Sequence, residues 1–224
     1  MLLSVLIPVY QHHPATLLEA LANDIEALGA REVEVLVVDD SADPRFFFWH
    51  ALYQTTRFDW LQVFAHPHNL GRSKARNFLM SQAKGQFICF LDGDVELPAG
   101  LLSAYVDALR KAPAVYCSGI SCPPDAPANL RNWYTQQVEV KTAQVRNQAP
   151  YRSFSAANFA MPRTFANTVQ FPENHQGYGH EDTHFGLQLL QAGLAVRHFD
   201  LPVIHASDEA DAVYLQKIKE SVQN

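Results

Sequence analysis

The stretch Gln86-Phe-Ile-Cys-Phe-Leu91 runs directly into Asp92-Gly93-Asp94. A short apolar run that ends at an Asp-Gly turn signal is typical of a buried strand. In an extended segment the side chains of Asp92 and Asp94 point to the same side. Hard divalent cations bind carboxylates together with water and phosphate oxygens, so the pair is a candidate diphosphate-metal site. The alternative is a turn whose acidic residues cap a helix that starts near Pro98.

Outward from this stretch, short apolar or β-branched runs alternate with segments of helical periodicity. This alternation predicts βαβ units, and hence an α/β fold with a mostly parallel central sheet and helices on both faces. The further strands of this part are expected at 3–9, 33–38, 61–65 and 115–120. The helices are expected after Pro14 up to a stop at Gly29, near 45–54, at 72–83 and from Pro98 onward.

The regular alternation of predicted strands and helices ends after Ser121. A Pro-rich loop at 122–127 precedes a polar, helix-like stretch at 133–144, followed by a predicted strand at 154–161 and a helix at 182–192. We expect one domain over 1–224, with a nucleotide-binding half at 1–120 and an acceptor-binding half at 121–224.

The composition is that of a folded protein and excludes some functional classes. The 224 residues are 48% apolar and 18% charged, as in a folded globular chain, and the net charge of −6 argues against broad nucleic-acid binding. The three cysteines lack zinc-site spacing, so a reducing, cytoplasmic location is the simplest interpretation. The apolar segment 1–10 is too short to span a bilayer, and membrane contact is expected to be peripheral at most. The oligomeric state stays open.

Two further groups follow predicted strands or begin predicted helices. Asp39-Asp40 could accept hydrogen bonds from a nucleoside, although taken alone the pair is more often explained by ordinary turn and cap chemistry. The segment 69–77, Asn-Leu-Gly-Arg-Ser-Lys-Ala-Arg-Asn, places three cations in the first turns of a helix, where the macrodipole disfavours positive charge. An anionic ligand or nearby acidic residues would balance them, and a solvated basic patch is the alternative. Gly71 would permit close backbone approach to such a ligand.

The late segment Gly177-Tyr-Gly-His-Glu-Asp182 ends in two carboxylates at a predicted helix start. Capping is the common reason for acidic residues there, but a glycine-hinged loop also suits a general base. His205 follows the apolar run 201–204 and could bind a metal, although a lone histidine is more often structural. The aromatic cluster at 46–49 is expected in the core.

Together these motifs resemble family 2 glycosyltransferases. The resemblance rests on six pieces in order: Ser4-Val-Leu-Ile-Pro-Val-Tyr10, Val37-Val-Asp-Asp-Ser41, Asn69-x-Gly71, Ala75-Arg-Asn77, Phe90-Leu-Asp-Gly-Asp94 and Gly179-x-Glu-Asp182. The late Gly-x-Glu-Asp element and the later histidine also resemble galactosyltransferase and chondroitin-polymerase type domains. The resemblance implies a GT-A fold, a UDP-sugar or similar donor, Mn²⁺ or Mg²⁺, a carbohydrate or glycoconjugate acceptor, and usually inversion.

The resemblance also implies roles for single residues. On the donor side these are Pro8, Val9 and Tyr10 around the base, Asp40 on the base, Gly71 and Arg76 facing the nucleotide, and Asp92 near the ribose or sugar. Asp94 and His205 would bind the metal, and Asp182 would be the catalytic base. Asn158 and Glu181 are candidates on the acceptor side.

Some features depart from the family pattern. No glycine follows the acidic pair within Asp40-Ser41-Ala42, and His184 stands where a second acidic residue often follows. A QxxRW motif is absent, so we expect one sugar to be transferred per encounter. The alternatives are a non-catalytic GT-A module that binds a nucleotide sugar or a partner and, with less support, a sugar nucleotidyltransferase. The latter usually has a Gly-rich basic loop where this chain has Tyr10-Gln-His-His-Pro14.

Overall fold

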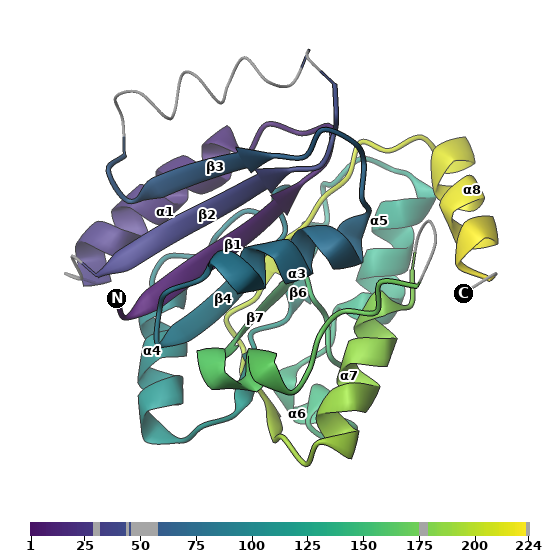
Figure 1. Cartoon of the computed structure of the whole chain (residues 1–224). Helices are drawn as coiled ribbons and strands as arrows, with labels where there is room; N and C mark the ends of the chain where they lie inside the picture. The colour runs from purple at the N-terminus through teal and green to yellow at the C-terminus, as the bar shows by residue number, and fades with distance from the viewer. Residues whose placement is uncertain (29–31, 44, 46–57, 175–178, 223–224) are drawn as a thin grey trace.

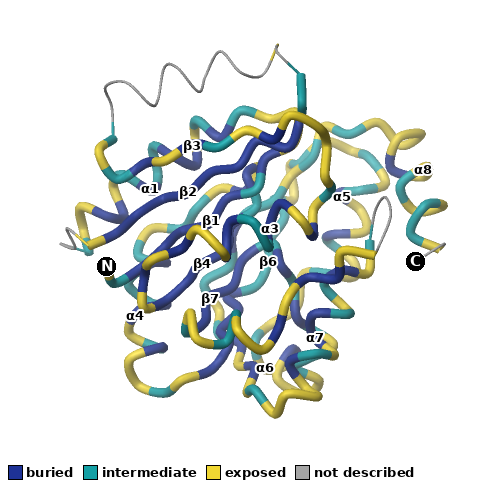
Figure 2. The backbone as a smooth tube through the Cα atoms, in the orientation of Figure 1, coloured by how far each residue is buried: buried dark blue, intermediate teal, exposed yellow. Residues whose placement is uncertain are grey.

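The computed structural model describes residues 1–28, 32–43, 45, 58–174 and 179–222. A seven-stranded sheet in the order β3-β2-β1-β4-β7-β5-β8 forms the centre, with helices on both faces (Figure 1). The strands of the large sheet are buried along most of their length, and the helix faces that point away from the sheet are exposed (Figure 2). The predicted α/β fold class is confirmed.

The first part of the sheet is parallel. Its strands are β1 (Leu3–Val9), β2 (Val33–Asp39), β3 (Leu61–Ala65) and β4 (Phe87–Leu91). β1 lies between β2 and β4, in register from Leu3 with Val33 to Val9 with Asp39. Helices cover both faces, which explains why β1 and β2 are mostly apolar. The buried Ser4 hydroxyl of β1 donates to Glu34 Oε1 of β2 over 2.6 Å.

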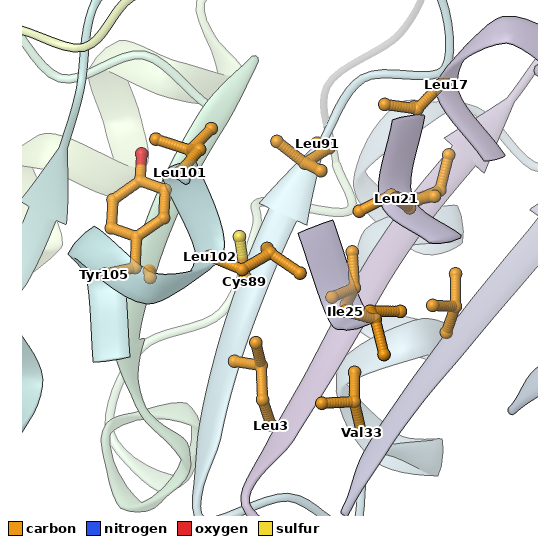
Figure 3. Packing of buried hydrophobic residues seen from close by; sticks show 14 of the residues in the cluster. Leu3, Leu17, Leu21, Ile25, Val33, Cys89, Leu91, Leu101, Leu102 and Tyr105 are labelled. Carbon is orange, nitrogen blue, oxygen red and sulfur yellow. The ribbon is translucent and has the colours of Figure 1, made fainter. Parts of the chain in front are cut away.

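The helices α1 (Ala15–Leu28) and α4 (Leu101–Lys111) pack on one face of the sheet. Ile25 of α1 lies close to Leu3 and Val33, and Leu102 of α4 lies beside Cys89 of β4 (Figure 3). The opposite face carries α3 (Arg72–Gln82) and α7 (Glu181–Gln191). Side chains of the strands alternate between these two cores, as the two-residue period of a strand requires.

The second part is less regular. β7 (Asn158–Pro162) runs antiparallel between β4 and β5 (Val115–Cys117), and β8 (Val196–His198) pairs parallel with β5. A small second sheet joins β6 (Ile120–Ser121) to β9 (Val203–Ile204). The helical elements are α5 (Leu130–Tyr134), a π turn (Thr135–Glu139), α6 (Ala143–Arg146), a 3₁₀ helix (Arg163–Asn167) and α8 (Asp211–Ser221).

Three sequence predictions need correction in this part. The strand expected at 115–120 is split after Cys117. The amide and hydroxyl of Ser118 donate to Asn158 Oδ1, and Gly119 has a positive φ of 94°. The strand expected at 154–161 starts only at Asn158, since Phe154 and Ala156 pack into the core from a turn. The helix expected at 133–144 is divided among α5, the π turn and α6.

Two predictions fall outside the residues that the structure describes. These are the helix near 45–54, apart from Arg45 itself, with its aromatic cluster at 46–49, and the stop at Gly29. Within the described residues, no helix combines the length and the apolar character that a bilayer crossing requires.

Candidate active site

The parallel strands β1, β2 and β4 end at one edge of the sheet, and candidate residues follow each of them (Figure 1). Tyr10 comes after β1, Asp40 after Asp39 of β2, and Asp92 after β4. In open parallel sheets ligands bind beyond this edge. The fold therefore gathers the donor-side candidates around a single region.

Gly93 allows the Asp92–Asp94 turn to lie against the end of β1. A Cβ at this position would be 3.0 Å from Val9 Cγ2 and 3.3 Å from the Pro8 carbonyl oxygen, which is tighter than ordinary contact. The Asp92 amide also donates to the Ala157 carbonyl over 2.9 Å. The acidic turn is thus fixed between β1 and the segment before β7.

Asp94 and His205 approach each other, as the proposed metal pair requires. His205 Nε2 lies 3.4 Å from Asp94 Oδ2, and the Asp94 side chain is 53% exposed against 14% for His205. Desolvation opposes the charge of Asp94, but bonding and attraction to His205 outweigh it and hold the pKa of Asp94 below its usual range. Burial likewise opposes the charge of His205, while Asp94 raises the pKa of that imidazole.

This pair fits a hard or borderline divalent cation. Adjacent ligands of an octahedral ion, each about 2.1 Å from it, lie about 3 Å apart, close to the separation seen here. The buried His205 Nδ1 has no hydrogen-bond partner among the described residues. Among the residues that the structure describes, no group of three His, Cys, Asp or Glu side chains could hold a metal ion. Phosphate oxygens and water would therefore complete the coordination.

Arg76 connects the acidic turn to α7. Its side chain is only 3% exposed, and it donates to Asp92 Oδ1 over 2.8 Å and to Glu181 Oε1 over 3.2 Å. The Phe171 ring centroid lies 5.2 Å from the guanidinium carbon. Burial opposes the charge of Arg76, but Asp92 and Glu181 outweigh it and raise the pKa of the guanidinium. Arg76 therefore reaches both carboxylates from inside the protein.

Asp182 is held by one oxygen and leaves the other without a partner. Oδ2 accepts a hydrogen bond from the Ala156 amide over 2.9 Å, and the buried Oδ1 has no hydrogen-bond partner in the structure as described. Desolvation and then repulsion by Glu181 raise the pKa of Asp182 to about 7, although Arg76 partly opposes the shift. A carboxyl that titrates near neutrality matches what a general base needs.

A cavity of about 570 Å³ borders Asp182. Its wall comes from the loop after β5, the π turn, α6 and the segment before β7. Asn158 also borders it, but its Oδ1 accepts from Tyr105 Oη and Ser118 Oγ, and its Nδ2 donates to the Gly119 carbonyl. Asn158 thus fixes the wall, and its contact with an acceptor stays a prediction.

Asp40 holds the loop that precedes α3. Oδ1 accepts from the Leu70 amide over 2.9 Å and lies 2.7 Å from His66 Nδ1, while Oδ2 accepts from the Gly71 amide over 2.8 Å. Gly71 has a φ of 87°, a left-handed value that favours glycine. A second cavity, of about 330 Å³, is lined by residues 69–74 and Glu181 among others.

The three base-pocket candidates differ in exposure. Val9 is buried, Pro8 is partly buried and Tyr10 is 55% exposed at the sheet edge. The Gln11 amide that follows donates to Ser41 Oγ, which ties the end of β1 to the end of β2. Tyr10 is thus free to turn toward a ligand at this edge, and its contact with a base stays a prediction.

Sequence reasoning missed three basic residues around the larger cavity: Lys141, Arg146 and Arg152. A signal was present, because residues 140–172 contain no Asp or Glu while carrying Lys141, Arg146, Arg152 and Arg163. The pairing of Arg76 with Glu181 was also missed, since 105 positions separate them in the sequence.

The model of the family described as "Glycosyl transferase family 2" matches residues 4–167. Among solved structures, S. aureus TarS 1-349 aligns with a TM-score of 0.66 and 21% identity over 99% of this chain and 71% of that one. The structure of TarS 1-349 in complex with UDP gives 0.61 and 23%, over 94% and 59% respectively.

The mannosyltransferase PcManGT from Pyrobaculum calidifontis, in complex with GDP-Man and Mn²⁺, gives a TM-score of 0.64 and 19% identity over 99% of this chain and 64% of that one. The chain spans 39% of a longer TarS structure. No curated protein matches the chain. The solved structures share the GT-A fold, and because the family model covers most of its length, the chain belongs to glycosyl transferase family 2.

Proposed function

We propose that the chain transfers a sugar from a UDP-sugar to a hydroxyl of a carbohydrate or glycoconjugate acceptor, with Mn²⁺ or Mg²⁺ and with inversion at the anomeric carbon. The observation that carries the proposal is Asp182. It borders a cavity of about 570 Å³, and its buried Oδ1 has no hydrogen-bond partner within the described residues. A UDP complex of one structural neighbour and a GDP-Man and Mn²⁺ complex of another support the donor class and the metal.

In this proposal residues 1–120 bind the nucleotide. Pro8, Val9 and Tyr10 line the base pocket at the end of β1. Asp40 shapes that pocket through the loop it holds at Leu70 and Gly71. Further donor-side roles fall to Asp92, which lies near the ribose or sugar, and to Arg76, which faces the nucleotide across Asp92.

Residues 121–224 supply the acceptor side, and the reaction is a direct displacement. Asp182 Oδ1 takes the proton of the acceptor hydroxyl as that oxygen bonds to the anomeric carbon, while the bond from this carbon to the diphosphate oxygen breaks. Asp94 and His205 would hold the cation, which would supply positive charge to neutralise the departing diphosphate. Positioning and electrostatics carry the rate, so no covalent enzyme intermediate forms. One sugar is transferred per encounter.

The test is titration calorimetry of UDP with and without Mn²⁺, combined with a donor-hydrolysis assay. We expect Mn²⁺ to tighten UDP binding and Asp94→Ala to weaken the Mn²⁺-supported affinity about tenfold or more, because a metal ligand is lost. Asp107→Ala removes an exposed carboxylate on α4 and is the matched control. UDP binding unaffected by Mn²⁺ and by Asp94→Ala would refute the metal assignment. Donor binding without any turnover would favour the non-catalytic alternative.

A further inference from the structure

Two cationic side chains, Lys141 and Arg152, line the cavity beside Asp182. Both residues are exposed, and neither forms an ion pair with any described residue. The chain as a whole has a net charge of −6, so unpaired positive charge in one cavity goes against its average character. Positive charge that a protein leaves unpaired in a concave wall attracts anionic ligands.

Two other charged residues of the wall are already paired within the protein. Glu139 Oε2 accepts from Arg131 Nη1 and from Thr135 Oγ1, each over 2.9 Å. Arg146 is buried, and its Nη2 lies 3.1 Å from Asp200 Oδ1. Glu139 is therefore already committed to Arg131 and Thr135 and does not pair with the two exposed cations, and the charge of Arg146 is balanced by Asp200.

Arg146 also fixes the position of Lys141. Its Nε donates to the Lys141 carbonyl over 3.1 Å, and its Nη2 donates to the carbonyls of Ser118 and Phe199 over 3.0 Å and 2.8 Å. Gly119 has a φ of 94°, and a Cβ there would lie 2.6 Å from Arg146 Nη2, so a larger residue would strain the backbone and displace the guanidinium. The segment that carries Lys141 is thus anchored to the loops after β5 and β8, which lowers the entropy cost of binding a ligand there.

We propose that this cavity selects an acceptor bearing an anionic group, a phosphate or a carboxylate, which Lys141 and Arg152 bind while a nearby hydroxyl faces Asp182. The inference rests on the proposed transferase function and deepens it by naming the acceptor class. Guanidinium and ammonium groups form charge-assisted hydrogen bonds with both kinds of oxyanion. Residues 140–172 carry four cations and no acidic residue, so the charge of this segment also favours an anionic ligand.

The test is an NMR titration of the ¹⁵N-labelled chain, saturated with UDP and Mg²⁺ so that the donor site is filled. Inorganic phosphate is added in one arm and acetate in the other, and the backbone amides of Thr142 and Ser153 are followed. We expect saturable shifts at both amides. A tighter response to phosphate would identify a phosphorylated acceptor, and a tighter response to acetate a carboxylated one.

The variant Lys141→Gln/Arg152→Gln should weaken the anion affinity at least about tenfold, because each charge-assisted bond is worth about a factor of ten. The control Arg110→Gln/Lys111→Gln removes two exposed charges from α4, and its affinity should stay within about twofold of the parent. Shifts that do not saturate, or equal affinity in the Lys141/Arg152 variant, would overturn the proposal. Failure of UDP to bind in the same samples would instead overturn the proposed function.

Discussion

The charged groups Asp40, after β2, and Arg76, on α3, differ from those around the cavity beside Asp182 in where their partners lie. Asp40 and Arg76 find their partners inside the protein, in loop amides and in two carboxylates. Asp182 keeps one oxygen without a hydrogen bond, and Lys141 and Arg152 have no ion pair within the described residues. In the proposed function, the groups that are already paired hold the site together, and the unpaired groups are the ones expected to meet a ligand.

Asp182→Asn is the sharpest way to break this comparison. The amide keeps the shape of the side chain and can still accept from the Ala156 amide, but it cannot take a proton. General-base catalysis contributes about 10²–10⁴-fold, so transfer at saturating donor should fall by about that factor while UDP affinity is retained. Asp208→Asn, which changes an exposed carboxylate, is the control. Transfer within about tenfold of the parent enzyme would exclude Asp182 as the base.

Arg76→Met should cause the largest loss of stability among these variants. It leaves the buried Glu181 and the partly buried Asp92 without their cation, and breaking such a buried pair costs about 3–5 kcal/mol. Arg72→Met removes a 48% exposed guanidinium that lies 3.7 Å from the same Glu181 carboxylate, and it should cost at most about 1 kcal/mol. Urea unfolding of the two variants measures the difference. Equal losses would mean that Arg76 does not hold the site.

The regular half of the fold follows from local patterns that the sequence displays. β1 begins and ends where its mostly apolar run begins and ends, because helices cover both faces of that strand. β3, at the edge of the sheet, alternates buried Leu61 and Val63 with exposed Gln62, and its bounds follow the same local pattern. Asp92 and Asp94 were found for the same reason, since any polar residue directly after such a strand lies at the ligand-binding edge. Local pattern was sufficient for α1 after β1 and for α3 after β3, whereas α4 begins at Leu101 and not at the expected Pro98.

The irregular half depends on contacts that no local pattern encodes. β5 ends at Cys117 because the Asn158 side chain, 40 positions away, bonds Ser118. Arg146 reaches backbone carbonyls of β5 and of the chain beyond β8, and nothing near it in the sequence indicates these partners. Sequence reasoning also missed a role for Lys141 and Arg152, because exposed cations are common on protein surfaces. Only the fold shows that the two side chains share one cavity wall.

Asp40→Asn tests a carboxylate that is already paired within the protein, and its effect on stability should be smaller. One oxygen would become an amide group that donates, and it would then face an N–H of Leu70 or Gly71 instead of accepting from it. Loss of a buried acceptor costs about 1–3 kcal/mol, and the loop before α3 should loosen first. Hydrogen exchange at the Leu70 and Gly71 amides checks the site of the change. Faster exchange elsewhere, with these two amides unchanged, would contradict the role of Asp40.

The pH profile of transfer tests the Asp182 carboxylate, which has an oxygen without a hydrogen-bond partner in the described structure. Desolvation and Glu181 raise the pKa of Asp182 to about 7, and a base acts only when deprotonated. At saturating donor, the rate should therefore fall about tenfold for each pH unit below 7 and level off above it. Calorimetry of UDP binding over the same range separates this effect from titration of the donor site. A flat profile between pH 5 and 7, roughly the range below that pKa, would contradict the assignment.

Glu181→Gln should then move this profile, which is the smallest effect expected. Glu181 repels the charge on Asp182, so its removal favours the deprotonated form and lowers the pKa of Asp182. The release of Arg76 from Glu181 acts in the same direction, because Arg76 attracts the Asp182 carboxylate. The midpoint of the pH profile should move to lower pH by up to about one unit, equivalent to about 1.4 kcal/mol. A midpoint that stays or rises would contradict the repulsion of Asp182 by Glu181.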